Sequence, residues 1–579
     1  MSGLRGGLGV GVVALALLAG AGGCDGNGDG PPAGGARGGS AGGTLLYYVS
    51  TPYSHVDPQR IYEGAVVSNF TRTVYRQLVA FPISTDAQVS GTPVADLATD
   101  VGTSTEGGRT WSFTVKDGVA WEDGRPITCE DFRYGASRIF ATGVIVGGPS
   151  YFLSYLDIPT DPATGLPAYK GPYDGEGQAL FDRAVTCDGN TITYHFKRPW
   201  PDFPLAIASL HLADPYRQDK DLGAKSNDQV FSDGPYRVEG NTWRKNAGAT
   251  LVRNENYDPS TDSTEIRKAL PDEIRFDVGE TPETISDRLI ADHGGAEYAV
   301  TPEVVPPADY SEITGGVADR SAVVRTPYVT YLVPHFRTEA MSNPAVREAL
   351  KVSTNVNGYI TALGGVRTGT PAESMVSPSV PGYRENPAFA GSNSGDVDAA
   401  LRILAHAGVR TPVPITFTYF SAGGAADNAA AALKDTWDRA GFDVTLDPEG
   451  APYDLVGNPD KDTDVMWGGW GADWPDEMTV EPLVFDSRVN LTPESDGNDW
   501  GAYRSDQFNA LVDKARSAET MEGQAAVLHR ADLVLGRDVA YIPLVVVRMF
   551  LLHGSKVTGY VNTPASGGYP DLGPIGVGS

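Results

Sequence analysis

Tryptophans, glycines and carboxylates gather in one segment, residues 463–476, which reads TDVMWGGWGADWPD. Asp464 to Trp467 has the composition of a buried strand, and the glycines after it predict that the strand ends there in a tight turn. Asp473 would then lie on a loop just past the strand's carboxyl end, where ligands bind in open α/β sheets. Indole surfaces beside one carboxylate suit an amphipathic solute that carries a positive charge.

The three tryptophans of this segment also have a simpler interpretation. They can belong to an ordinary core, with Asp473 as an ordinary turn residue. If the segment does bind a ligand, the alternation of side chains along a strand predicts that not all three indoles face it. The candidates from this segment are Trp467, Trp470, Gly471, Asp473 and Trp474.

Length and charge limit the classes of function. A chain of 579 residues is too long for one core, so two or three domains are expected. Its 45 Lys and Arg against 73 Asp and Glu give a formal charge of −28, which repels phosphate backbones and argues against nucleic-acid binding. The eight histidines show no zinc-ligand spacing, and no HExxH, CxxC or Walker A motif occurs. We therefore expect neither an enzyme nor a cofactor or metal.

The N-terminus has the order of a signal peptide. Arg5 precedes an apolar run from Leu8 to Ala21, and small residues lead to Cys24. LLAGAGGC resembles a bacterial lipoprotein signal, which implies a signal peptide over residues 1–23, a lipidated Cys24 and a Gly-rich tether through residue 43. Two acyl chains would anchor the protein stably to a membrane. The alternative is ordinary secretion with an incidental cysteine.

Two further cysteines, Cys129 and Cys187, would be exported to an oxidising compartment. A pair of cysteines in such a compartment predicts one disulfide, which would be worth about 4 kcal/mol if it is unstrained. The alternative is two buried free thiols.

Hydrophobic patterns predict the local elements. Residues 44–50, 109–119 and 190–197 read as strands, and residues 62–78 and 129–140 as helices. Residues 396–445 read helix, strand, helix, strand, which favours an α/β unit with a largely parallel sheet. Ser394 is the expected N-cap of the first of these helices, and Asn343 followed by Pro344 predicts another helix start.

Seven segments, in order along the chain, resemble the extracytoplasmic solute-binding proteins of ABC importers, of the peptide/nickel type known as family 5. The resemblance extends over almost the whole chain after the tether. The segments are VYRQLVAF (74–81), WSFTVKDGVAWEDGRPITCEDFRYGASRIF (111–140), ITYHFKRPWPDFPL (192–205), SDGPYRVEG with LVRNENYDP (232–259), NPAVREALKVSTNVNGYI (343–360), DVDAALRILAHAGV (396–409) and GGWGADWPD (468–476).

This resemblance implies a fold and a division into domains. The expected fold is an α/β, bilobal arrangement of the periplasmic-binding-protein type II-like class, with an extra subdomain and a ligand cleft between two lobes joined by two crossovers. Such crossovers hinge two bodies by changing a few dihedral angles. The expected bounds are 44–79, 206–325 and 541–579 for lobe I, 80–205 for the subdomain inserted in lobe I, and 326–540 for lobe II.

The resemblance also assigns roles to residues. In peptide-binding relatives an Asp in the GW..D segment holds the ligand's α-ammonium group, and Asp473 is the matching position. Many relatives read D-Y-P-D-P, whereas this chain has Glu477 in place of the second proline, so the loop can be set differently. Tyr48 and Ser50 are expected to face the tryptophans from lobe I. Trp500 is a further candidate wall, and Arg367 is one of several arginines that could meet a ligand carboxylate.

The expected function is capture of a solute, with short peptides as the leading class, and delivery to a membrane permease and its ATPase. The protein would be a monomer anchored by lipid on the extracytoplasmic face of the bacterial cell membrane. A sensor of the same fold without a transport role, or a binder of a non-peptide solute, are the alternatives. A secreted hydrolase is a third hypothesis, but the sequence offers no nucleophile for it.

Overall fold

The computed structural model describes residues 39–578, except 163–164, 392, 422–423, 451–454, 456 and 494. The predicted signal peptide, Cys24 and most of the tether lie outside the described residues. Within these ranges, no helix has the length and apolar character needed to cross a bilayer.

A five-stranded sheet forms around the first predicted strand. β1 lies between two parallel partners, β10 and β11, and the order across the sheet is β11-β1-β10-β9-β8. Tyr47 of β1 and Phe276 of β10 pack in the core beneath helix α1. The bounds are β1 (Thr44–Val49), α1 (Gly64–Thr73), β8 (Tyr236–Val238), β9 (Thr250–Arg253), β10 (Glu273–Val278), α7 (Pro282–Ala291) and β11 (Ala299–Val300).

A second, four-stranded antiparallel sheet lies within the predicted insert, in the order β4-β5-β7-β6. The predicted strands at 109–119 and 190–197 are confirmed but shorter, and the predicted helix at 129–140 is α3. The bounds are β2 (Val79–Ala80), α2 (Ala87–Ser90), β3 (Val94–Ala95), β4 (Thr103–Thr105), β5 (Thr110–Thr114), α3 (Cys129–Arg138), α4 (Tyr151–Tyr155), α5 (Gln178–Ala184), β6 (Val185–Asp188), β7 (Thr191–His195) and α6 (Phe203–Ser209).

The predicted disulfide is confirmed: Cys129 at the start of α3 is bonded to Cys187 of β6. The bond closes a loop between residues 58 positions apart and ties α3 to the sheet. Replacing both cysteines with serine is expected to lower the free energy of unfolding by about 2–5 kcal/mol, because the unfolded chain regains conformational freedom. Calorimetry of the variant beside the wild type measures this loss, and equal melting temperatures would contradict it.

The third sheet has six strands, in the order β13-β17-β12-β16-β14-β15. β14 runs parallel to β15 and β16, but the β12–β16, β12–β17 and β13–β17 pairs are antiparallel. The prediction of a largely parallel sheet therefore holds for the strands of residues 396–445 but is wrong for the rest of this sheet. The bounds are β12 (Ser321–Pro334), β13 (Gly369–Pro371), β14 (Val413–Phe420), β15 (Phe442–Glu449), β16 (Val465–Gly471) and β17 (Ile542–Leu552).

Several helices in the second half of the chain begin at side-chain caps. Asn343 caps α9 with Pro344 in its first turn, as predicted. Asp396 caps α11 by accepting from the backbone N–H of Ala399, so the predicted cap at Ser394 is wrong by two residues. The bounds are α8 (Glu339–Ser342), α9 (Pro344–Ser353), α10 (Val356–Leu363), α11 (Val397–His406), α12 (Gly424–Arg439), α14 (Glu481–Phe485), α15 (Ser487–Asn490), α16 (Asp506–Arg516) and α17 (Met521–Asp538).

The glycines of the Trp-rich segment do not end their strand, contrary to prediction. β16 continues to Gly471, because its backbone pairs with β12 as far as that residue, and aromatic rings lie where side chains would otherwise stand. A Cβ on Gly468 would lie 2.9 Å from the Trp500 ring, and one on Gly471 would lie 2.2 Å from Tyr328. Glycine in a strand often marks such a close approach.

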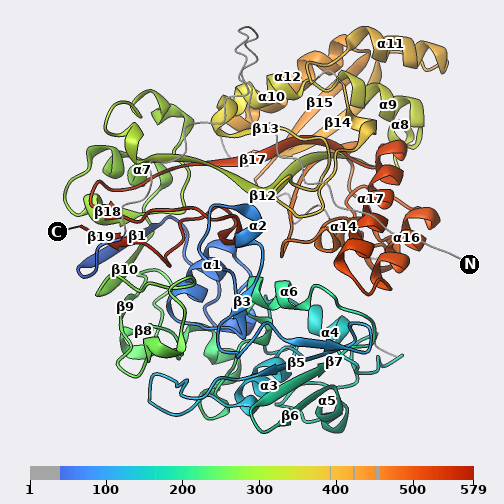
Figure 1. Cartoon of the computed structure of the whole chain (residues 1–579). Helices are drawn as coiled ribbons and strands as arrows, with labels where there is room; N and C mark the ends of the chain where they lie inside the picture. Colours follow the sequence, from blue (N-terminus) through green and yellow to red (C-terminus); the bar gives the residue numbers. More distant parts are fainter. Residues whose placement is uncertain are drawn as a thin grey trace, which may run out of the picture. The chain divides into compact units, whose positions relative to one another are not determined.

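Two long strands, β12 and β17, link the main cores and run side by side (Figure 1). Phe550 near the end of β17 packs with Tyr48 of β1, whereas Leu544 near its start packs with Phe417 of β14. Strands of this kind can act as a hinge between bodies. The exact lobe bounds stay a prediction. The chain ends with a short pair, β18 (Val557–Thr558) and β19 (Gly576–Val577).

Candidate functional site

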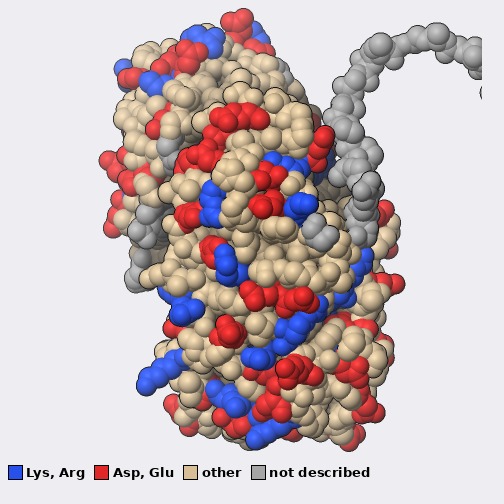
Figure 2. Space-filling model, turned by 90° about the vertical axis from the view of Figure 1, so that its left-hand side faces the viewer, with Lys and Arg blue, Asp and Glu red and all other residues tan. Residues whose placement is uncertain are grey.

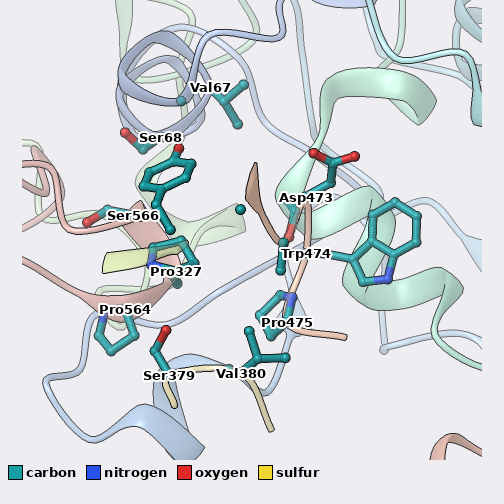
Figure 3. A pocket seen from close by; sticks show the side chains of 18 of the residues that line it. Val67, Ser68, Pro327, Ser379, Val380, Asp473, Trp474, Pro475, Pro564 and Ser566 are labelled. Carbon is teal, nitrogen blue, oxygen red and sulfur yellow. The ribbon is translucent and has the colours of Figure 1, made fainter. Parts of the chain in front are cut away.

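A cavity of about 130 Å³ separates the α1 side of the chain from the loop that follows β16 (Figure 3). Asp473 contributes a carboxylate to its wall, and no lysine or arginine is among the described residues that line it. Small and apolar residues form most of the rest. The lining residues are Tyr62, Gly64, Val67, Ser68, Ala87, Gly91, Ser209, Leu210, Pro327, Tyr328, Ser379, Val380, Pro381, Gly471, Ala472, Asp473, Trp474, Pro475, Pro564, Ala565, Ser566 and Gly567.

Asp473 accepts hydrogen bonds from residues far away in the sequence. The Tyr62 hydroxyl donates to its Oδ2 at 2.6 Å, and the Tyr151 hydroxyl donates to the same oxygen. The Asp473 backbone N–H donates to the Thr479 hydroxyl at 3.0 Å, which fixes the loop. Burial raises the pKa of Asp473 to about 6, although both tyrosine hydrogen bonds favour its charged form. The carboxyl group is therefore mostly ionised at neutral pH.

Trp474 turns away from the cavity and enters the core of the predicted insert. Figure 3 shows its indole directed away from Pro327 and Ser566. It is only 2% exposed, and its Nε1–H donates to the carboxylate of Asp202, the residue before α6. The Tyr151 ring packs edge-on against it, with 4.6 Å between the ring centroids. The β16 loop is thereby joined to the insert by an indole as well as by Asp473.

The other two tryptophans of the segment do not line the cavity. Trp470 donates its Nε1–H to the Thr479 carbonyl at 2.9 Å, so it supports the loop that carries Asp473. Trp467 is partly buried against the core that contains α12, and its ring lies beside Phe420. Of the candidates from residues 463–476, Gly471, Asp473 and Trp474 are among the lining residues, although the Trp474 indole points into the insert.

Three candidates from elsewhere lie away from the cavity. Tyr48 is buried, and its hydroxyl accepts from Arg288 at 2.7 Å. The Ser50 hydroxyl donates to Glu303 at 2.6 Å. Trp500 is buried against Gly468 on the face of β16. Strand alternation and long-range packing direct these side chains into other contacts.

Basic residues near the cavity are already engaged. Arg367, the candidate partner for a ligand carboxylate, stacks over Tyr310 and Phe550 and is not among the lining residues. Arg72 lies on α1, the same helix as Ser68 of the lining, but it forms a two-pronged ion pair with Asp571 at 2.9 Å. The cavity therefore presents negative charge to a ligand.

Tyr62 and Tyr151 were not among the residues expected from the sequence. Tyr62 falls in the stretch interpreted as a helix, although α1 begins two residues later, at Gly64. Tyr151 opens α4, a stretch without a recognisable motif. Their contacts with Asp473 join residues 411 and 322 positions apart, so no local pattern indicates them.

Comparison with known families identifies the class of protein. The family model of the "Bacterial extracellular solute-binding proteins, family 5 Middle" matches residues 92–490. The chain belongs to this family. The match contains the β16 loop and Asp473, whereas the α1 side of the cavity and Pro564 to Gly567 lie outside the matched residues.

Two relatives of this chain carry the names of peptide-binding proteins. The chain is 22% identical over 501 residues to the oligopeptide-binding protein OppA of Bacillus subtilis, covering 84% of this chain and 85% of that one. It is 23% identical over 526 residues to a probable D,D-dipeptide-binding periplasmic protein, DdpA, of Escherichia coli, covering 88% and 90% of the two chains.

Solved structures agree on the fold. The chain superposes on "Clavulanic acid biosynthesis oligopeptide binding protein 2" with a TM-score of 0.81 and 26% identity, covering 94% of this chain and 98% of that one. It also superposes on the oligopeptide-binding protein AppA of Bacillus subtilis, solved with a nonapeptide, with a TM-score of 0.66 and 15% identity, covering 93% and 100%. These matches confirm the expected type II-like binding-protein fold.

Proposed function

We propose that this protein is the substrate-binding component of an ABC importer and that it captures short peptides through their free α-ammonium group. Its family and relatives support a solute-binding role with peptides. The observation that carries the proposal is Asp473, a carboxylate on the wall of a cavity whose described lining has no lysine or arginine. An ion pair with this carboxylate would be strong because the site excludes much of the solvent.

Capture would proceed by closure of the two predicted lobes. Tyr62 and Tyr151 reach Asp473 from the α1 side and from the insert, and Trp474 reaches into the insert from the β16 loop. These contacts hold the cavity together. A ligand that binds the closed arrangement better than the open one shifts the population toward closure.

Export and delivery complete the proposal. The N-terminal pattern supports a signal peptide and a lipidated Cys24, which would hold a monomer on the extracytoplasmic face of the membrane. There it would deliver its ligand to a membrane permease, which works with an ATPase. On the face drawn in Figure 2, acidic and basic side chains are interspersed, and the protein as a whole carries a formal charge of −28.

Replacing Asp473 with asparagine is expected to weaken the binding of free-amine peptides by roughly a hundredfold, because a charge-assisted hydrogen bond in a shielded site is lost. The change preserves the size of the side chain and its ability to accept from a tyrosine hydroxyl. Isothermal titration calorimetry with tri-alanine measures the loss.

The matched ligand is N-acetyl-tri-alanine, which lacks the ammonium group. We expect the acetylated peptide to bind the wild type weakly and to lose little further affinity on the variant. An equal loss for both peptides would mean that Asp473 acts through the structure of the loop and does not pair with the ligand.

A further inference from the structure

The two oxygens of Asp473 are not equivalent. Both tyrosine hydroxyls donate to Oδ2, from Tyr62 at 2.6 Å and from Tyr151. Among the described residues, the hydrogen bonds to this carboxylate both go to Oδ2 and none goes to the other oxygen, Oδ1. A carboxylate oxygen that already accepts two hydrogen bonds has its lone-pair directions filled. A ligand cation therefore finds one open oxygen, not two.

The Tyr151 hydroxyl is held in place by its surroundings. The Tyr151 ring packs edge-on against Trp474, whose indole is in turn fixed by its hydrogen bond to Asp202. Tyr62 lies just before α1 and is 43% exposed, so its hydroxyl is positioned by its hydrogen bond to Oδ2. Burial, together with the neighbouring Asp473 carboxylate, raises the pKa of both tyrosines, so both remain protonated donors at neutral pH.

Ammonium and guanidinium groups place different demands on a carboxylate. A guanidinium forms its strong pair as a fork, with two parallel N–H bonds to the two oxygens. A primary ammonium is a compact charge that a single oxygen can accept. We propose that Tyr62 and Tyr151 are specificity-determining residues that make the cleft select a primary ammonium over a guanidinium. This inference rests on the proposed function, in which Asp473 pairs with the ligand's cation.

The test compares two probes that differ only in the cationic group: tri-alanine and tri-alanine whose N-terminal amine is converted to a guanidine. Titration calorimetry is run on the wild type, on Tyr62→Phe, on Tyr151→Phe and on the double variant. The wild type is expected to bind the ammonium probe at least tenfold more tightly. The double variant frees Oδ2, so the preference should fall to less than threefold or reverse, with intermediate values for the single variants.

A pH profile distinguishes this role from simple packing. The hydroxyls stabilise the charged form of Asp473, so the double variant should lose affinity for the ammonium probe at a higher pH than the wild type does. The titratable groups facing this carboxylate are Tyr62, Tyr151 and Tyr328. The phenylalanine variants keep the aromatic rings and remove only the hydroxyls. Circular dichroism with thermal melting checks that each variant is folded.

The possible outcomes separate the two proposals. Equal or tighter binding of the guanidinium probe by the wild type would overturn the selectivity, and so would a tenfold ammonium preference that survives in the folded double variant. Failure of the wild type to bind either probe would instead overturn the peptide ligand, and the selectivity with it. If Asp473→Asn leaves the affinity for the ammonium probe unchanged, the ion pair on which both proposals rest is absent.

Discussion

Replacing Trp474 with alanine is expected to weaken peptide binding by roughly a hundredfold or more. The indole is almost fully buried, and its contacts with Tyr151 and Trp200 belong to the predicted insert, not to its own lobe. Truncating a buried tryptophan costs about 3–5 kcal/mol, and each 1.4 kcal/mol is tenfold in affinity. Because the contacts join two bodies, the loss should fall mainly on the closed arrangement.

Small-angle X-ray scattering and calorimetry with tri-alanine measure the two consequences of this change. The variant should have a larger radius of gyration than the wild type and should bind the peptide more weakly. Trp474→Phe is the matched control: it keeps an aromatic ring but loses the bond from Nε1–H to Asp202, so its affinity should fall by roughly tenfold. Wild-type affinity in Trp474→Ala would show that this contact does not stabilise the closed form.

The ligand-free protein is expected to be more stable near pH 5 than near pH 8. Burial raises the pKa of several carboxyl groups above their ordinary values, so the folded state binds these protons more tightly than the unfolded chain. Stability therefore rises as the pH falls through the folded pKa values and levels off near the unfolded values of about 4. The groups are Glu477 and Asp499, each with a pKa raised to about 8, and Asp202, Asp473 and Asp532, each raised to about 6.

Carboxyl groups with the opposite shift act only in stronger acid. Arg217 lowers the pKa of Asp219 to about 2, and Arg267 and Arg76 lower that of Asp96, so their stabilisation is present above the unfolded pKa. It is lost only as the pH falls below about 4. Burial also lowers the pKa of three histidines, which oppose part of the gain as the pH falls below about 6.5: His335, His529 and His553. Since one pKa unit is worth about 1.4 kcal/mol, Glu477 or Asp499 alone would contribute about 3–4 kcal/mol between pH 8 and pH 5. The total gain should therefore be at least of that order.

Thermal melting across this pH range provides the measurement, with a rise of several degrees expected toward pH 5. Glu477→Gln imitates the protonated acid, so this variant should be more stable than the wild type at pH 8 and should show a shallower profile. Glu255→Gln, at an exposed position, should leave the profile unchanged. A melting temperature that stays flat or falls between pH 8 and pH 5 would contradict the prediction.

Local elements of this protein follow from its sequence because they depend on neighbouring residues. The alternation of β5 and β7, the cap and proline at the start of α9, and the helical spacing of α3 are properties of a few consecutive positions. The sequence of motifs also indicated the family and the fold. Asp473 was expected on a loop after a strand, and it lies two residues beyond the end of β16.

The predictions that were wrong concern positions where distant segments meet. Gly468 and Gly471 were expected to end a strand, but they remain in it because their backbone pairs with β12. The Trp500 and Tyr328 rings occupy the space of their missing side chains. Strand β12 runs antiparallel to β16, because β12 enters this sheet from the other core of the chain. Neither effect is visible in a short window of sequence.

The sequence by itself predicted a candidate carboxylate for the ligand's charge, and it indicated which cysteines pair and which fold surrounds them, since residue type, local periodicity and the order of motifs are sufficient for these. Only the tertiary structure decided the partners of that charge. Tyr62 and Tyr151 reach Asp473 across separations of 411 and 322 residues, and Trp474 leaves the cavity for Asp202. Such contacts form only when distant parts of the chain pack against each other. The local preferences of residues do not specify that packing.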